Sequence, residues 1–341
     1  MKAVVVHAAG DLRVDELERP QCAPDQVLVE MEWGGICGSD VAYVKHGVSG
    51  TAILHDPLVL GHEVSGHVAE VGAEVVGVEV GQAVTVHPAT LVGQHQVVPE
   101  LVERTNLWPE VRYFGSAAFD PHEQGGFCQF RAVRADQLRM LPQGVSTRQA
   151  ALAEPFGVAL HAVARAGDLT GRTVLVNGAG PIGSLAVAAA RAKGAETVIA
   201  ADLSDPALAI ARELGAHQSF NVASGDSLPS EVDVAIEASG SPRALGPVFA
   251  AVRRGGTVVQ VGNLPAGEVS AALGQLVTRE INYVGSYRFV DEITEALQLM
   301  ADGVDVSAVV THEFTLDQAV EAFEMAADRA TGSSKVLLKL S

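Results

Sequence analysis

From Arg172 onward, the sequence alternates short apolar runs with longer segments of helical periodicity. Runs such as TVLVNGAG, TVIAAD and VDVAIEASG are apolar along most of their length, and each is followed by a stretch long enough for a helical crossover. Uniformly apolar strands joined by helices are typical of a parallel sheet that is covered on both faces. The pattern therefore predicts a doubly wound α/β domain in the second half of the chain.

The first crossover of this domain carries a glycine-rich turn. Gly178, Gly180 and Gly183 have the spacing G-x-G-x-x-G between a predicted strand and a predicted helix. In dinucleotide-binding turns these glycines permit a tight turn, close approach of a pyrophosphate, and close packing of helix on strand. Such turns also occur without a ligand, so the stronger signal is Asp202 at the end of the next apolar run, where a carboxylate accepts the ribose hydroxyls of NAD. No cation follows it before Arg212, and NAD is therefore favoured over NADP.

The first part of the chain has a different pattern, with short strand-like runs such as QVLVEMEWGGI and HEVSGHVAEVG interrupted by glycine and proline. It predicts a β-rich unit with irregular loops. A helix is predicted to begin after Ser146, a suitable N-cap, and to run to His161. The chain closes with an amphipathic helix and the strand KVLLKL. We therefore predict three segments, 1–150, 151–288 and 289–341, of which the last returns to the first domain.

Charge and cysteine content limit the partners of the chain. Its 341 residues include 23 Lys and Arg against 41 Asp and Glu, and the formal net charge of −18 opposes binding to nucleic acid or anionic membranes. Cys22, Cys37 and Cys128 form neither a disulfide framework nor a CxxC motif, which fits a reducing compartment. The start turns polar too soon for a signal peptide, and no run of about 18 apolar residues offers a membrane span. A cytoplasmic protein with a small-molecule partner is expected.

Residues of the types that bind zinc occur in three separate stretches. Cys37 lies in GGICGSD, His62 and Glu63 lie in VLGHEVSGHV, and Glu154 lies in ALAEPFGVALH. Three protein ligands and one open position are typical of a catalytic zinc ion. No short spacing guarantees that these residues meet, since His62 also fits an ordinary half-buried histidine and the acids fit a surface. Neighbours on a strand point to opposite faces, so direct ligation by both His62 and Glu63 requires a local bend.

Five stretches, GGICGSD, LGHEVSG, AEPFGVALHA, NGAGPIG and GSYRF, occur in an order that resembles the zinc-dependent medium-chain dehydrogenases. The resemblance runs from the first strand to KVLLKL. Glu154 before Pro155, together with Arg288 after GSY, is similar to the sorbitol dehydrogenase branch, and residues 112–127 and 285–289 are similar to L-idonate 5-dehydrogenases. This family implies an α/β fold, with a GroES-like β-rich catalytic domain and a Rossmann doubly wound domain for the cofactor.

The resemblance also implies roles for the candidate zinc ligands. Cys37 and His62 would bind a catalytic zinc ion directly, and Glu154 would bind it directly or through water. Glu63 would be either a ligand or an acid behind the ligands, with a catalytic role in both cases. Ser39, two residues beyond Cys37, matches the hydroxyl that starts the proton relay of this family.

Further roles follow from the same resemblance. Tyr43, His122 and Arg288 would line the substrate pocket. The cofactor-binding residues would be Gly178, Gly180, Pro181, Ile182, Gly183, Asp202 and Gly262. A homodimer or homotetramer is expected by resemblance alone.

Three departures from the family pattern are visible. The segment HPATLVGQHQVVPELVERTNLWPEVRYFG lacks the four cysteines that hold a second, structural zinc ion in some relatives, so one zinc ion is expected. Position 42 is Ala where many polyol dehydrogenases have His, and Ala207 stands where sorbitol dehydrogenases often have Arg. Cys128 has no ligand partner nearby in sequence and is expected to pack in the interior.

The expected function is zinc- and NAD-dependent oxidation of a secondary alcohol of a sugar acid, from L-idonate to 5-keto-D-gluconate, in a reversible reaction. A polyol dehydrogenase for sorbitol, xylitol or arabitol, or a threonine-type dehydrogenase, is the alternative within the same chemistry. A nucleotide-binding protein without catalytic activity is the alternative from another class, but the presence of Cys37, His62 and Glu154 argues against it.

Overall fold

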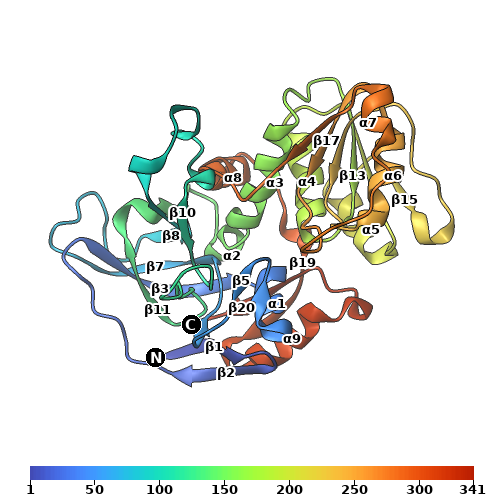
Figure 1. The fold of residues 1–341 in the computed structure, drawn as a ribbon. Coiled ribbons are helices and arrows are strands. Elements are labelled where there is room, and N and C mark those ends of the chain that lie inside the picture. The colour runs from blue at the N-terminus through green and yellow to red at the C-terminus, as the bar shows by residue number, and fades with distance from the viewer. The chain divides into compact units, whose positions relative to one another are not determined.

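The structure, a computed structural model, describes residues 1–341 with the exception of the side chain of Arg329. The chain forms two compact units, Met1–Glu154 with Val310–Ser341, and Pro155–Val309 (Figure 1). The first boundary lies shortly beyond the predicted residue 150. The second lies well beyond the predicted residue 288, because helix α8 (Glu292–Ala301) has a buried apolar face and Glu292 pairs with His161 of the same unit. The predicted α/β class is confirmed.

The unit Pro155–Val309 contains one six-stranded sheet in the order β15-β14-β13-β16-β17-β18, with all neighbouring pairs parallel. Numbered within the unit, this is the order 3-2-1-4-5-6 of the Rossmann fold. Its elements are α3 (Ala153–Arg165, whose first two residues belong to the other unit), β13 (Thr173–Asn177), α4 (Pro181–Ala192), β14 (Thr197–Asp202), α5 (Asp205–Glu213), β15 (Gln218–Asn221), β16 (Val232–Glu237), α6 (Pro242–Ala251), β17 (Val252–Gln260), α7 (Gly274–Arg279), β18 (Asn282–Gly285) and α8.

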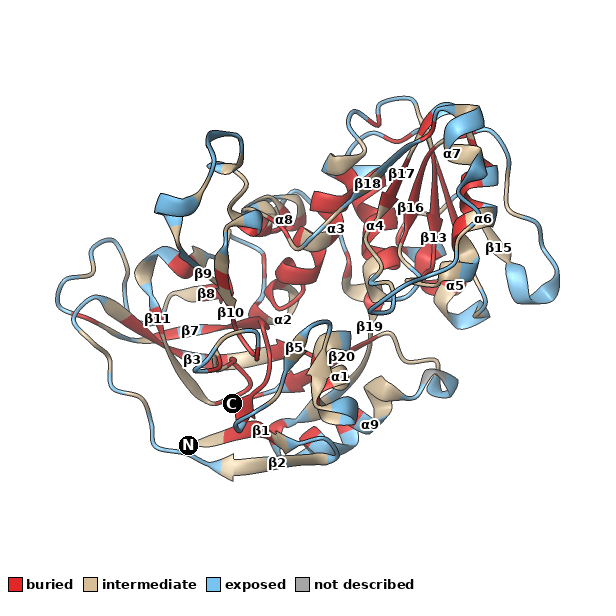
Figure 2. Cartoon of the chain, viewed as in Figure 1, coloured by how far each residue is buried: buried red, intermediate tan, exposed pale blue. Residues whose placement is uncertain are grey.

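The central strands of this sheet are buried on both faces. Val174, Leu175 and Val176 of β13 are each 0 % exposed, and Figure 2 shows β13 and β16 largely in the colour of buried residues. Helix α4 is buried from Gly183 to Ala190 through a run of small side chains, which lets it lie close to the sheet. The uniformly apolar strands of the sequence therefore correspond to a sheet without a solvent-facing side.

The other unit is built mainly from β-strands. Its largest sheet has the order β12-β8-β7-β3-β20-β19, and β11 also pairs with β3; smaller sheets are β2-β1-β6, β10-β9 and β4-β5. Its elements are β1 (Lys2–Ala8), β2 (Asp11–Glu16), β3 (Gln26–Gly35), α1 (Gly38–His46), β4 (Val48–Ser49), β5 (Ala52–Ile53), β6 (Leu58–Val59), β7 (Glu63–Val71), β8 (Ala83–Val86), β9 (Ala89–Val92), β10 (Glu110–Tyr113), β11 (Phe130–Arg134), β12 (Leu138–Met140), α2 (Thr147–Ala150), β19 (Val310–Thr315), α9 (Ala319–Ala327) and β20 (Lys335–Lys339).

The strand register of this sheet brings three distant segments together. Gly35 at the end of β3 pairs with Glu63, the first residue of β7, and also with Leu337 in β20. Because β7 and β20 flank β3, their first residues lie beside the loop that leads from β3 into α1. This register places the segments of the candidate metal site next to one another.

The helix predicted from Ser146 to His161 is wrong in one respect, because the structure has two helices, α2 and α3, separated at Ala151 and Leu152. Ser146 does cap α2, since its side chain accepts a hydrogen bond from the Gln149 amide. Pro155 explains the break: it has no N–H to donate one turn back, and proline is tolerated only in the first turn of a helix. Among the helices that the structure describes, none is both long and apolar enough to cross a membrane.

Candidate functional site

The structure brings three of the predicted zinc ligands together. Cys37 follows β3 and is the N-cap residue of α1, while His62 immediately precedes β7 and Glu63 is its first residue. One donor atom from each of the three lies within 4.8 Å of the others. The bend that this arrangement requires is present, because Gly61 adopts φ +96° in front of His62. Adjacent residues can therefore direct both donors to one point.

Asp40 connects the two ligand segments and was missed in the sequence. Its carboxylate is fully buried and accepts hydrogen bonds from the amides of Cys37 (3.0 Å) and Gly61 (3.3 Å). One of its oxygens also lies 3.8 Å from Nδ1 of His62. A carboxylate in this position orients an imidazole ligand. The available signal was its spacing, since an acid three residues after a helix N-cap commonly bonds back to the cap.

Lys335 holds Glu63 from the opposite end of the sequence. Its buried ammonium donates to Oε1 of Glu63 (2.6 Å) and to the carbonyl of Ile36 (3.0 Å). The other oxygen of Glu63, Oε2, is buried and has no hydrogen-bond partner among the residues that the structure describes. Gly35 leaves the room for it, because a Cβ there would collide with Oε2. An orphaned carboxylate oxygen beside a thiol and an imidazole fits a zinc ion, which would supply the missing partner.

The electrostatics of the pocket agree with a cation site. Burial alone would lower the pKa of His62, but the negative charges of Asp40 and Cys37 outweigh burial and raise that pKa to about 10. Burial raises the pKa of Glu63 to about 7, although the Lys335 ammonium opposes the shift. Without a metal the pocket therefore attracts protons, and a zinc ion binding there would displace them.

Glu154 is not one of the three clustered donors. It is buried at the start of α3, and its Oε1 accepts a 2.6 Å hydrogen bond from the hydroxyl of Tyr113 at the end of β10. The Tyr113 ring also lies edge-on to the His62 ring, with 5.7 Å between centroids. Glu154 nevertheless contributes to the raised pKa of His62. Direct ligation by Glu154 stays a prediction, and Tyr113 is a further neighbour that the sequence did not reveal.

Two residues predicted to contact substrate have structural contacts in this unit. The Tyr43 hydroxyl accepts a hydrogen bond from the Ala117 amide (3.0 Å), and its ring is buried in the core. His122 ties two loops together, because Nε2 accepts from the His55 amide (3.0 Å) and Nδ1 lies 3.0 Å from the carbonyl of Phe119. Their substrate roles stay predictions, and these contacts show that both also hold the loop that follows β10.

Ser39 and Cys128 complete the predicted residues of this unit. Ser39 is a half-buried residue in the first turn of α1, next to the ligand segment. Cys128 is buried, its thiol donates to the Phe130 carbonyl (3.2 Å), and burial raises its pKa to about 11. These contacts agree with the packing role expected for Cys128.

In the unit Pro155–Val309, the three glycines of the turn between β13 and α4 differ in how much space a Cβ atom would have. Gly178 has φ +91°, and a Cβ there would lie 2.5 Å from the Ser239 amide nitrogen. A Cβ on Gly183 would collide with the carbonyl oxygen of Gly178. Around Gly180, the N-cap of α4, a Cβ would meet no atom within 4 Å. Two glycines are therefore required by the fold, whereas Gly180 leaves space in front of the helix that starts with Pro181 and Ile182.

Two carboxylates shape the surroundings of this turn. Asp202 ends β14, and its Oδ2 accepts a 2.6 Å hydrogen bond from the Ala179 amide inside the turn. Glu237, at the end of β16, is fully buried and accepts from the Ser239 amide (2.6 Å) and the Asn177 side chain (2.7 Å). Glu237 was missed because its partners are backbone groups and an amide with no sequence signature.

Gly262 and Arg288 have distinct environments in the same unit. A Cβ on Gly262 would approach the backbone of Gly240, so Gly262 lies against the turn that Glu237 holds. Arg288 has φ +50°, and its guanidinium lies 5.0 Å from the centroid of the Tyr287 ring.

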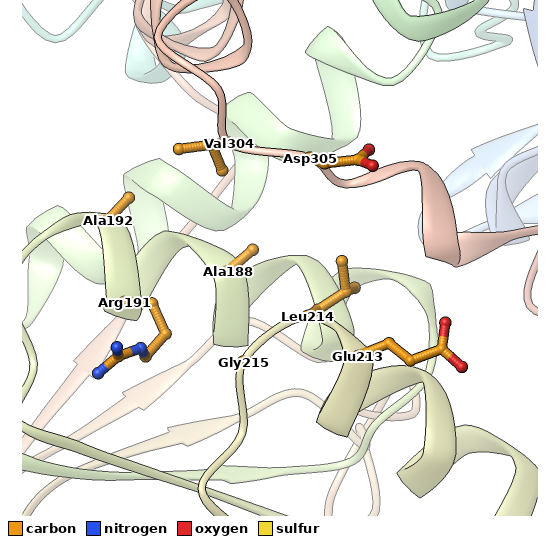
Figure 3. A pocket seen from close by; sticks show the side chains of 8 residues that line it. All are labelled: Ala188, Arg191, Ala192, Glu213, Leu214, Gly215, Val304 and Asp305. Atoms are coloured by element: carbon orange, nitrogen blue, oxygen red, sulfur yellow. The ribbon is translucent and has the colours of Figure 1, made fainter.

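A surface cavity of about 240 Å³ also lies on this unit, between α4, the end of α5 and residues 304–305. Figure 3 shows Ala188, Ala192 and Leu214 facing Val304, while the Arg191 side chain extends away. It contains none of the predicted site residues.

The chain resembles known proteins over nearly its whole length. The family described as "Zinc-binding dehydrogenase" matches residues 181–302, and "Alcohol dehydrogenase GroES-like domain" matches residues 23–143. Sorbitol dehydrogenase of Bacillus subtilis (strain 168) is 35% identical over 347 residues, which cover 99% of this chain and 97% of that protein.

Solved structures show the same likeness. L-idonate 5-dehydrogenase from Escherichia coli str. K-12 substr. MG1655 has a TM-score of 0.92 and 32% identity, with 99% of this chain and 97% of that chain covered. A zinc-binding dehydrogenase from Sinorhizobium meliloti 1021, bound to NADP, has a TM-score of 0.89 and 30% identity, with 99% and 98% covered.

Proposed function

The chain belongs to the zinc-binding dehydrogenases with a GroES-like domain, and on this premise we propose that it oxidises L-idonate to 5-keto-D-gluconate with zinc and NAD. The observation that carries the proposal is the cluster of Cys37, His62 and Glu63, in which one buried carboxylate oxygen of Glu63 has no hydrogen-bond partner among the described residues. A bound zinc ion acts as a Lewis acid that lowers the pKa of the substrate hydroxyl.

The residues around the cluster have separate tasks in this proposal. Cys37, His62 and Glu63 would hold the metal, and Asp40 orients His62 while it joins the two ligand segments. Lys335 fixes one oxygen of Glu63 and leaves the other directed to the ligand cluster. Ser39 would relay the hydroxyl proton of the substrate, accepting it while it releases its own proton to the cofactor ribose, and bound NAD would be the hydride acceptor.

The cofactor is proposed to be NAD. The open space at Gly180 and the amide groups at the start of α4 suit a pyrophosphate. Asp202, fixed by the Ala179 amide at the end of β14, would accept hydrogen bonds from the ribose hydroxyls and would repel a 2′-phosphate. Since the S. meliloti structure holds NADP, the coenzyme preference requires its own measurement.

A sugar acid is proposed as substrate because of Arg288. Its planar guanidinium can donate two parallel hydrogen bonds to a carboxylate, which a neutral polyol lacks. Two segments resemble L-idonate 5-dehydrogenases: GSYRF, which contains Arg288, and residues 112–127. The E. coli L-idonate 5-dehydrogenase structure, at 32% identity, supports the same substrate class.

The test is a substrate panel with purified zinc-loaded protein. NADH formation is followed with L-idonate, sorbitol, xylitol, arabitol and threonine, and the best substrate is repeated with NADP. We expect the highest kcat/KM for L-idonate with NAD. The variant Arg288→Lys should raise KM for L-idonate more than KM for sorbitol, because the planar fork is lost and the charge kept. Equal or greater turnover of a neutral polyol would contradict the sugar-acid proposal.

A polyol dehydrogenase is the second candidate. It is favoured by 35% identity to B. subtilis sorbitol dehydrogenase over 99% of this chain. Ala42, where many polyol dehydrogenases have His, argues against it. Sorbitol as the best substrate in the panel, with KM unaffected by Arg288→Lys, would establish this candidate instead.

A further inference from the structure

One face of helix α3 contacts the segment that carries Arg288 at several points. Gly157, His161 and Arg165 are spaced four residues apart and therefore lie on the same face of the helix. A Cβ on Gly157 would lie 3.1 Å from the backbone nitrogen of Ile293, so the absence of a side chain lets the start of α8 approach α3. Arg165 donates through Nε to the carbonyl of Gly285 at the end of β18 (3.1 Å).

The central contact of this face is a buried pair of side chains. Nδ1 of His161 lies 2.6 Å from Oε1 of Glu292, and both side chains are less than one-fifth exposed. The other oxygen of Glu292 accepts hydrogen bonds from the amides of Val290 (2.6 Å) and Asp291 (3.1 Å). Burial alone would raise the pKa of Glu292, but the His161 and Val290 hydrogen bonds lower it on balance. Glu292 therefore links α3 to the backbone just after Arg288.

Arg288 lies between the two anchored points, Gly285 and Val290. Its φ of +50° is in the left-handed region, which is unfavourable for a residue with a side chain. Such a conformation persists only where surrounding contacts hold it. The contacts of α3 on both sides of the turn provide that restraint.

We propose that the α3 face formed by Gly157, His161 and Arg165 is a brace that holds the turn 286–291 and so presents Arg288 to a substrate carboxylate. His161 and Glu292 are positioning residues, since they act through Arg288. The role of Arg288 in this inference rests on the proposed function.

The inference is tested with zinc-loaded full-length enzyme carrying Glu292→Gln, Arg288→Ala, or both. Glu295→Gln is the matched control, because Glu295 lies on the same helix and its carboxylate pairs with the exposed Lys193. Glu292→Gln is expected to raise KM for L-idonate about tenfold, with kcat and the KM for NAD unchanged, because misplacement of a binding group weakens substrate capture. The control should match the wild type.

The double variant distinguishes an effect of Glu292 on KM that acts through Arg288 from an effect that comes from a less stable fold around the turn 286–291. If the brace acts through Arg288, Arg288→Ala with Glu292→Gln has the same KM for L-idonate as Arg288→Ala alone, within about twofold. Additive effects of the two substitutions would overturn the inference.

Hydrogen–deuterium exchange gives a readout that needs no substrate. Peptides that cover residues 286–291 should exchange faster in Glu292→Gln than in Glu295→Gln or the wild type. Equal exchange would overturn the brace whatever the substrate proves to be. If L-idonate is not oxidised by the wild type, the proposed function fails, and the exchange measurement still decides whether α3 holds the turn.

Discussion

The metal cluster and the dinucleotide turn are both candidate binding sites, but they are held in different ways. The metal cluster is fixed by buried charges from distant parts of the sequence, with Lys335 on Glu63 and Asp40 beside His62. The turn between β13 and α4 is fixed by close backbone contacts that only glycine permits, as at Gly183.

This difference determines how each site should fail. Removing one charge from the metal cluster leaves its partner buried and unpaired, whereas adding one methyl group to the turn creates a collision. The first site should be sensitive chiefly to charge, although Gly35 also leaves no room for a methyl group beside Oε2 of Glu63. The second should be sensitive to volume in some positions and tolerant in others.

The largest effect is expected for Cys37→Ala, which removes a ligand of the metal cluster. Loss of the Lewis acid should lower kcat/KM about a thousandfold, and bound zinc measured by mass spectrometry should fall to near zero. Cys22→Ala is the control, since Cys22 is half-buried and its thiol donates to backbone carbonyls. Full zinc content in Cys37→Ala would show that the cluster is not the metal site.

Lys335→Met tests whether buried charge holds the metal cluster. It leaves Glu63 without its partner and should lower the free energy of unfolding in urea by about 3–5 kcal/mol. Lys339→Met, on the exposed side of the same strand, should change it by less than about 0.5 kcal/mol. Adding Glu63→Gln to Lys335→Met should restore much of the stability. Similar losses of unfolding free energy in Lys335→Met and Lys339→Met would show that buried charge does not hold the metal cluster.

Two alanine substitutions test the dinucleotide turn. Gly183→Ala places a methyl group against the Gly178 carbonyl and should lower the free energy of unfolding by about 2 kcal/mol. Gly180→Ala meets open space and should keep the stability, but it should weaken NAD binding about tenfold in a calorimetric titration, because the pyrophosphate needs that space. Unchanged NAD affinity in Gly180→Ala would contradict the assigned role.

The smallest effect is a pH dependence of the α3–α8 contact. The pKa of Glu292 is lower in the folded chain than its ordinary value of 4.5, so its contribution to stability is present above pH 4.5 and is lost as the pH falls through the folded-state pKa. The difference in unfolding free energy between the wild type and Glu292→Gln should be about 1.5 kcal/mol at pH 7 and should shrink below pH 4.5. A constant difference across this range would argue against an ionised Glu292.

The sequence predicted the features that depend on local pattern. The parallel sheet followed from its apolar runs, and the turn followed from Gly178, Gly180 and Gly183, because all the relevant contacts lie within one β-α crossover. Cys37, His62 and Glu63 were found as residue types, and the family resemblance joined them. Strand register then explains their meeting, since β3 pairs with both β7 and β20.

The residues that support the sites escaped prediction because their partners are distant or are backbone groups. Lys335 is 272 residues from Glu63, and nothing in KVLLKL distinguishes it from an ordinary strand lysine. Tyr113 meets Glu154 only because of how β10 lies in the folded unit. Glu237 binds backbone amides, which every residue possesses. The spacing of apolar residues along the sequence does not indicate which distant residues will form such contacts.

The separation between Glu63 and Lys335 has a consequence for biosynthesis. The whole of Pro155–Val309 is translated between these two residues, which takes on the order of ten seconds or more at typical elongation rates. During that time Glu63 lacks its ammonium partner, and β20 is not yet available beside β3. The unit Pro155–Val309 is continuous in sequence and is free to fold first on the ribosome. The metal cluster is completed only when β20 has been synthesised and pairs with β3.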